Sequence, residues 1–207
     1  MPSVYEERFD TTDKETMQIA EFELEKEDIF HLKNLYKLAY EWFMMQGFTS
    51  MDTPVDPGEP KDDKIEKLYW QRVLPNGNLE HHIWWRTEKI PKNNKYYKYV
   101  IKFDFQTLNM GKTDVVSKGQ KVGTNKGDVI LRCRAYLVLD YNRWWRNHGF
   151  LKHFYNLWKR YVFRDKIEHL KTELWVTTYK LEDVLKQYLN MKTPHEMQKP
   201  FHPELGV

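Results

Sequence analysis

The residues that could carry out chemistry in this chain are few, and their spacing is poor for it. Cys133 is the only cysteine. The alternation of apolar and polar residues around it predicts a strand position on an apolar face, where a thiol is a small core residue rather than a nucleophile. Of the eight histidines, His81 and His82 are adjacent in a predicted strand and point to opposite faces, so they do not suit one metal ion. We predict no metal site and no cofactor, with a site built from distant histidines as the open alternative.

Other catalytic patterns are also missing from the sequence. The stretch from Gly119 to Gly123 has the glycines of a phosphate loop, but the pattern after it predicts a hairpin rather than a helix. Serine occurs only at positions 3, 50 and 117, and none lies in a nucleophile elbow. The carboxylates concentrate in the first third of the chain, which is typical of a solvated acidic face. The sequence therefore predicts no catalytic residues and favours a non-enzymatic protein.

The net charge of +3 hides a strong asymmetry along the chain. Residues 1–63 contain 6 Lys and Arg against 16 Asp and Glu, whereas residues 64–207 contain 27 against 14. Either the two parts pack together and their fields largely cancel, or an acidic and a basic face are both exposed and meet different partners or a neighbouring subunit. We favour cancellation at this stage, because long-range fields govern association more than folding.

One candidate interface is the outward face of a predicted sheet, which combines cations with flat side chains. Such a face can neutralise phosphates and stack bases in a nucleic acid. The alternative, which the lack of a ribonucleoprotein motif favours, is that cross-strand and cation–π pairs stabilise a wet sheet face. The candidate residues on this face are Trp84, Arg86, Lys98, Lys102, Arg132 and Arg134.

A second candidate interface is the segment from Tyr141 to Arg164, which is rich in cations and aromatic residues and contains no acidic residue. Its apolar stripe could pack against the sheet, which we favour, or form a surface for an acidic partner. Binding to an anionic membrane surface is the third alternative, and packing in the core would bury the stripe that it needs. The candidate contact residues here are Arg143, Arg146, Lys159 and Arg160.

The elements that must position these residues follow from the periodicity. Apolar residues at steps of three and four predict a helix over 28–47, with Asp28 as its N-cap and Gly47 just after its end. Residues 50–63 hold three prolines and five acidic groups, which predicts a loop. Alternating residues over 64–141 predict an antiparallel sheet with a hairpin at Asn76-Gly77 and another turn near Lys118-Gly119-Gln120.

The C-terminal part is predicted to be helical over 148–190, with an interruption near Arg164, and residues 191–207 are predicted to be an extended tail. Five apolar residues of this part form a heptad-like seam. The seam fits either packing within the chain or self-association, and its members are Ile167, Leu170, Leu174, Leu181 and Val184.

These elements predict an α+β fold: a four- to five-stranded antiparallel meander, covered on one face by an N-terminal helix and by long C-terminal helices. A length of 207 residues suits one domain, which we place at 1–190. No apolar run reaches the roughly 18 to 20 residues needed to cross a bilayer, no secretory signal is evident, and a single cysteine fits a reducing compartment. We expect a cytoplasmic protein.

For function, the sequence favours a binding or structural module that mediates protein–protein assembly, including self-association, through charge-segregated surfaces. A nucleic-acid-binding protein that uses the basic aromatic sheet face is the first alternative. A small-molecule-binding protein or enzyme with a pocket between the sheet and the helices is the second, because aromatic-rich cores can hold apolar ligands.

Overall fold

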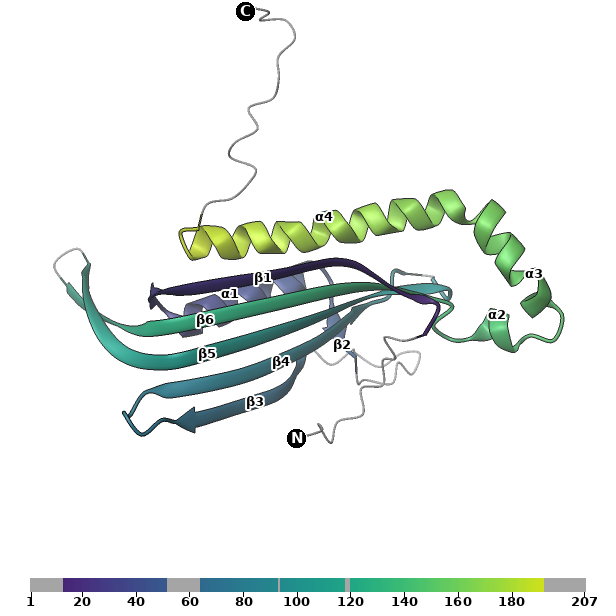
Figure 1. Cartoon of the computed structure of the whole chain (residues 1–207). Coiled ribbons are helices and arrows are strands. Elements are labelled where there is room, and N and C mark those ends of the chain that lie inside the picture. Colours follow the sequence, from purple (N-terminus) through teal and green to yellow (C-terminus); the bar gives the residue numbers. More distant parts are fainter. Residues whose placement is uncertain (1–12, 52–63, 93, 118–119, 192–207) are drawn as a thin grey trace, which may run out of the picture.

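The computed structural model describes residues 13–51, 64–92, 94–117 and 120–191, which form an antiparallel sheet with helices on one of its faces (Figure 1). The strands are β1 (Thr16–Phe30), β2 (Thr49–Ser50), β3 (Glu66–Val73), β4 (Leu79–Lys89), β5 (Tyr97–Ser117) and β6 (Gln120–Leu139). The helices are α1 (Leu32–Met45), α2 (Trp144–Asn147), α3 (Leu151–Leu157), the π-helical turn η1 (Trp158–Val162) and α4 (Arg164–Tyr188). The predicted α+β class, with an N-terminal helix and a long C-terminal helix on an antiparallel sheet, is confirmed.

The sheet has six strands rather than four or five, in the order β1-β6-β5-β4-β2, and β3 also pairs with β4. Strands β3 to β6 form the predicted meander, while β1 adds beside β6 and leaves its own outer side as an edge. Strands β2 and β3 both pair with β4, opposite Thr87–Glu88 and Leu79–Trp85 respectively. The loop predicted over 50–63 is described only at Ser50, which lies in β2, and at Met51.

Three glycines near the middle of the chain, Gly111, Gly123 and Gly127, lie inside the two longest strands, and the pairing of these strands agrees with the turn predicted near Lys118-Gly119-Gln120. Strands β5 and β6 run unbroken for 21 and 20 residues, and the predicted loose hairpin is their far end, with Ser117 opposite Gln120. A register shift between Leu108 and Gly111 bends the pair. Gly127 lies against this bend so closely that a Cβ atom there would come within 2.9 Å of the Met110 Cα. The glycine therefore permits a close backbone approach rather than ending a strand.

The first helix starts later than predicted, and Asp28 is not its N-cap. Strand β1 continues through Phe30 because Asp28 still pairs with Gly127 of β6. His31 is the N-cap instead, and its Nδ1 accepts a hydrogen bond from the Asn34 amide at 3.4 Å. Gly47 follows the helix with a φ of +76°, in the left-handed region that favours glycine, as predicted.

The core lies between the sheet and the two helices α1 and α4. Alternate residues of β5 and β6 point into it, among them Phe103, Phe105 and Cys133, all at most 1 % exposed. Phe43 of α1 packs against Trp85 and Phe103 with ring centroids 5.9 and 5.7 Å apart. This helix-covered face is the dry layer that the alternation predicted, and it holds the two helices in place.

The opposite face of the sheet, which we call the open face, buries more apolar side chains than expected. Val100, Tyr136 and Val138 form a second buried cluster there, packed by Met51 and Tyr141. The one-dry-face prediction therefore needs correcting at this end of the sheet. The reason is that Met51, which follows β2, and Tyr141, which follows β6, lie over the strand ends.

The C-terminal helices turn sharply between η1 and α4. Helix α4 runs along the sheet, whereas α2 and α3 lie beyond the end of the sheet (Figure 1). The interruption expected at Arg164 lies one residue earlier, at Phe163, after the π-helical turn. This turn determines which of the cationic residues face the sheet and which do not.

Candidate binding surfaces

The candidate residues on the open face lie in neighbouring cross-strand rows, and a carboxylate in one row pairs with cations of the next. Arg86, Lys102 and Arg134 stand opposite one another on β4, β5 and β6. Asp104, one step along the open face, accepts hydrogen bonds from both arginines, at 2.5 Å from Arg86 and 3.1 Å from Arg134. A single carboxylate thus lies between two guanidinium groups, which is a stabilising diagonal arrangement.

The remaining cations of this face are also engaged. Arg132 pairs with Glu23 of β1 at 2.9 Å, and Lys98 pairs with Glu88 at 2.8 Å. Lys102 is 4 % exposed and lies 5.7 Å from the ring of Tyr136. Burial of Lys102 differs from the expectation that it faces water, and the second apolar cluster around Tyr136 is the reason.

The flat residue of this face, Trp84, is partly buried and has the Arg86 guanidinium 5.6 Å from its ring. Together these contacts match the alternative in which cross-strand ion pairs and cation–π pairs stabilise the face. Nucleic-acid binding remains an untested hypothesis. A phosphate backbone would have to compete with Asp104, Glu88 and Glu23 for these cations.

The heptad-like seam faces the sheet. Ile167, Leu170, Leu174 and Leu181 are buried in the core cluster, between 0 and 6 % exposed, and Val184 is partly buried. This is the packing within the chain that the sequence left open. In this fold the seam is occupied by the chain's own strands.

Exposed apolar side chains of the described residues are most concentrated in the tip, which we define as residues 143–162 (α2, α3 and η1). Contrary to the expected packing of its stripe against the sheet, most of the stripe is exposed, because the chain bends beyond the end of the sheet and no strand of the described residues lies beneath it. Phe154, Leu157 and Tyr161 are 48, 55 and 72 % exposed. The exposed large apolar residues of the tip are Trp144, Phe150, Phe154, Leu157, Tyr161 and Val162.

The inner side of the tip is an aromatic stack. Trp145 stacks on Trp158 with ring centroids 4.5 Å apart, and Trp158 stacks on Phe163 at 4.7 Å. Tyr96, which precedes β5, meets Trp158 and Phe163 edge-on. The sequence predicted the aromatic richness of the segment but not which rings would be covered.

A buried polar cluster fastens the tip to the start of β1. Glu15 Oε2 accepts hydrogen bonds from the Tyr155 hydroxyl and from Lys159 Nζ, both at 2.7 Å. The Tyr155 hydroxyl has only one proton, so Tyr96, 3.1 Å away, must donate to it. Burial raises the pKa of Tyr96 to about 12 and that of Tyr155 further. Two neutral phenols, Tyr96 and Tyr155, therefore form a chain of hydrogen bonds that ends on the Glu15 carboxylate.

Arg146 forms the second fastening. It pairs with both carboxylate oxygens of Asp13 at 2.8 Å and with Asp140 at 3.3 Å. The hydrogen bond from Arg146 holds the pKa of Asp13 below its usual value. Of the predicted contact residues, Arg146 and Lys159 are thus tied to carboxylates of the chain's first strand region, while Arg143 and Arg160 are exposed.

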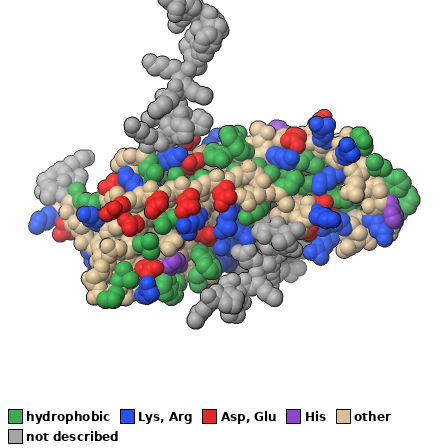
Figure 2. Space-filling model, in the orientation of Figure 1, with side chains coloured by type: hydrophobic (Ala, Val, Ile, Leu, Met, Phe, Trp, Pro, Cys, Tyr) green, Lys and Arg blue, Asp and Glu red, His purple; other side chains and the backbone are tan. Residues whose placement is uncertain are grey.

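An acidic surface lies on β1, away from the tip. Alternate residues of this strand point outward on the open face, and Figure 2 shows a row of acidic side chains there. We call Glu21, Glu23, Glu25 and Glu27 the acidic stripe; all four are exposed. Around the strand edge, Tyr179 of α4 donates to the Glu21 carbonyl at 3.5 Å and its ring contacts that of the exposed Trp175.

Two of the side chains that were considered for catalysis or metal binding, Cys133 and His81, are buried. Cys133 is fully buried, and burial raises the pKa of its thiol well above the ordinary value. His81 is buried, and its Nδ1 lies 2.8 Å from the Thr107 hydroxyl. In the described ranges, no three His, Cys, Asp or Glu residues group closely enough to hold a metal ion. No helix in the same ranges is long and apolar enough to span a membrane.

Two pockets open at the margins of the helical layer. One of about 300 Å³ lies between α1 and the start of β3, where the Tyr36 hydroxyl donates to Glu66 at 2.7 Å. The other, of about 390 Å³, lies in the bend between η1 and α4. No family model matches this chain, and neither the curated proteins nor the solved structures contain a significant match to it.

Proposed function

We propose that this protein is a non-enzymatic structural module that assembles with further copies of itself, the tip of one copy docking on the acidic stripe of the next. The observation that carries the proposal is the tip's exposed apolar surface. Its side chains at 150, 154, 157 and 161 follow one side of the helical segment at steps of four, three and four. A soluble monomer rarely leaves a large apolar patch uncovered, and such patches are typical of interaction sites.

Charge complementarity supports the choice of partner. The tip carries Arg143, Lys152 and Arg160 as exposed cations, and its sequence contains no carboxylate. The acidic stripe offers four exposed carboxylates, and the aromatic pair Trp175 and Tyr179 lies around the edge beside it. Each surface therefore combines an apolar area with charges opposite in sign to those of the other surface.

The two surfaces cannot satisfy each other within one molecule. The tip lies beyond the end of the sheet at which β1 begins, and the stripe runs along β1 away from it (Figures 1 and 2). A contact between two different patches is heterologous, so it builds a ring or an open chain of copies rather than a two-fold dimer. The expected product is an oligomer whose size grows with protein concentration.

Sedimentation equilibrium of the full chain over a concentration series tests the proposal. We expect oligomers at an ionic strength of about 0.01 M, where charges interact over roughly 30 Å, and weaker assembly at about 1 M. The double variant Phe150→Ser, Tyr161→Ser should be monomeric under the low-salt conditions. The matched control is Tyr69→Ser, Val73→Ser, which removes exposed apolar groups from β3 and should assemble like the wild type.

Three outcomes would overturn the proposal. The wild type could remain monomeric at every concentration and salt level. The β3 control could lose assembly to the same extent as the tip variant, which would indicate nonspecific association. Finally, a monomeric wild type that sediments with anionic phospholipid vesicles, and does so only with an intact tip, would assign the tip to a membrane surface instead.

A further inference from the structure

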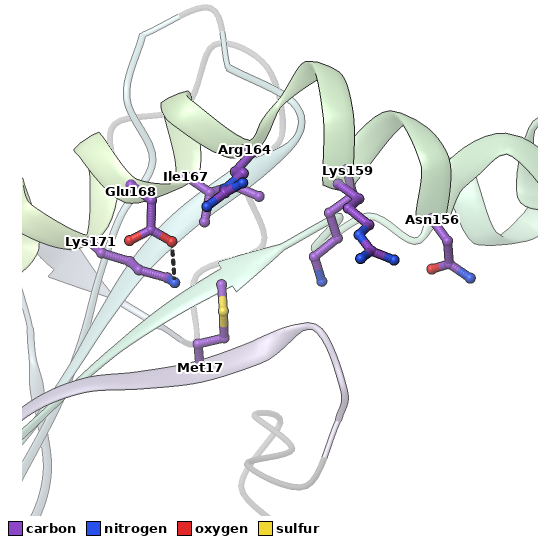
Figure 3. Close-up of a pocket in the computed structure, with 8 residues that line it drawn as sticks. Met17, Asn156, Lys159, Arg164, Ile167, Glu168 and Lys171 are labelled. Carbon is purple, nitrogen blue, oxygen red and sulfur yellow. Dashed lines mark hydrogen bonds and ion pairs between the residues drawn. The ribbon is translucent and has the colours of Figure 1, made fainter.

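The pocket in the bend between η1 and α4 is lined largely by cations. It is bounded by Met17 of β1, by Asn156 of α3, by Lys159 and Arg160 of η1, and by Arg164, Ile167, Glu168 and Lys171 of α4. Figure 3 shows Met17 rising from β1 toward the helices, with Lys159 and Lys171 extending toward the strand. Four cations and one carboxylate thus line an open pocket of about 390 Å³, a volume in the range of small-molecule sites.

The charges of this pocket are only partly balanced. Lys159 is neutralised by Glu15 at 2.7 Å and Lys171 by Glu168 at 2.8 Å. In the described part of the chain, no ion pair joins Arg160 or Arg164 to a carboxylate, and the Arg160 guanidinium lies 5.7 Å from the centre of the Tyr161 ring. Both guanidinium groups therefore keep their hydrogen-bond donors for an added anion, and arginine suits the geometry of a phosphoryl group.

The backbone at the bend adds to this positive potential. Arg164 is the first residue of the 25-residue helix α4, and its N-cap, Phe163, supplies no side-chain hydrogen bond. A helix N-terminus attracts anions through its exposed amides and its dipole, although Asp165 in the first turn offsets part of this charge. A π-helical turn, here η1, is rare and occurs often at functional sites.

The base of the pocket is apolar. Ile167 is 6 % exposed and Met17 is partly buried, so an inorganic ion alone would leave this part of the pocket unused. We propose that the pocket binds a phosphate ester, with its phosphoryl group held by Arg160 and Arg164 and its apolar part resting on Met17 and Ile167. The site does not require self-association, although it shares Arg160 with the tip.

Isothermal titration of the full chain with phenyl phosphate and with inorganic phosphate tests this site. Phenyl phosphate should bind more tightly than inorganic phosphate because only the ester reaches the apolar base. Arg164→Glu should weaken binding at least about tenfold, since it replaces a guanidinium donor with a repelling carboxylate. A glutamate is favourable in the first turn of a helix, so this variant should fold.

Lys166→Glu is the matched control. It makes the same charge change in the same helical turn, but Lys166 is exposed and does not line the pocket. We expect at most about a twofold loss, which is a long-range charge effect. Equal losses in the two variants would show that only the overall charge matters, and would overturn the site.

A second arm distinguishes the source of the phosphoryl group. The protein is sedimented with phosphatidylcholine vesicles that contain or lack phosphatidic acid. Binding to phenyl phosphate in solution indicates a soluble ester. Binding only to phosphatidic acid vesicles, lost in Arg164→Glu and kept in Lys166→Glu, indicates a lipid headgroup. If the wild type binds neither probe, no phosphate ester site exists here. A monomeric wild type that still binds phenyl phosphate would refute the assembly proposal alone.

Discussion

The body of the protein, its sheet with α1 and α4, and the tip are both rich in aromatic residues but use them in opposite ways. In the body, Phe103 is fully buried and surrounded by other rings. In the tip, Phe150 is 67 % exposed. Burial of apolar area stabilises a fold, whereas the same area left exposed is available for association. Aromatic content by itself therefore does not distinguish a core from an interface.

The two regions also differ in what holds them in place. Helix α4 is held by a row of buried leucines, whereas the tip is fastened by an aromatic stack and by the carboxylates of Glu15 and Asp13. Apolar packing is insensitive to pH, while carboxylate fastenings depend on ionisation. The tip is therefore the part of the fold that changes in solution conditions should loosen first.

The largest contrast is expected for ring truncation. Phe103→Ala should lower the free energy of unfolding by about 3–5 kcal/mol, because it removes a fully buried ring and leaves a cavity. Phe150→Ala should change it by less than about 0.5 kcal/mol, since the ring is largely exposed. Urea denaturation followed by circular dichroism measures both. Similar losses in the two variants would mean that the tip is part of the core.

A smaller effect is expected at the fastening of the tip. Glu15→Gln leaves Lys159 without its carboxylate in a partly buried site, and a hydrogen bond to a charged group contributes about 1.5–3 kcal/mol. Hydrogen exchange should therefore speed up in α3 and η1 while α4 beyond its first turns stays protected. Glu25→Gln, on the exposed stripe, is the control and should alter neither. Uniform loss of protection along α4 would contradict a local fastening.

The smallest effect is expected on acidification. The pKa of Asp13 is lowered in the folded state, so its pairing with Arg146 contributes stability that is present above the usual value of 3.8 and is lost as pH falls through the lower folded value. Exchange in α2 should accelerate over this acid range. Asp13→Asn should already show the faster exchange at neutral pH and little further change. An unchanged pH profile in this variant would exclude Asp13 as the group responsible.

The elements with a regular pattern of apolar residues or a characteristic turn sequence were predicted correctly. Strict alternation through Tyr99, Phe103 and Cys133 identified the buried face, and the Asn76-Gly77 hairpin followed from turn chemistry, with Gly77 at a φ of +81°. The predicted start of α1 was wrong, because β1 pairs with β6, which is distant in sequence, and this pairing extends the strand past Asp28. Local periodicity contains no information on that pairing.

The candidate surfaces were predicted less well for a related reason. Asp104 lies beside Arg86 and Arg134 only because of the register of three strands, and no single segment reveals a register. The stripe of the tip has the spacing of a buried helix face, yet the sheet ends before it. A signal was available in the absence of any acidic residue between Tyr141 and Arg164, which is unusual for a segment that only packs on its own chain.

Docking of the tip on the acidic stripe can be tested by mixing two variants with reversed charges. One variant reverses the tip through Arg143→Glu and Lys152→Glu; the other reverses the stripe through Glu21→Lys, Glu25→Lys and Glu27→Lys, and leaves Glu23, which pairs with Arg132. Each variant alone should be monomeric at low salt, since like charges then face each other in every tip-to-stripe contact. An equimolar mixture should regain the mass of a complex in sedimentation equilibrium. A mixture that stays monomeric while the wild type assembles, or variants that each assemble alone like the wild type, would contradict docking of the tip on the acidic stripe.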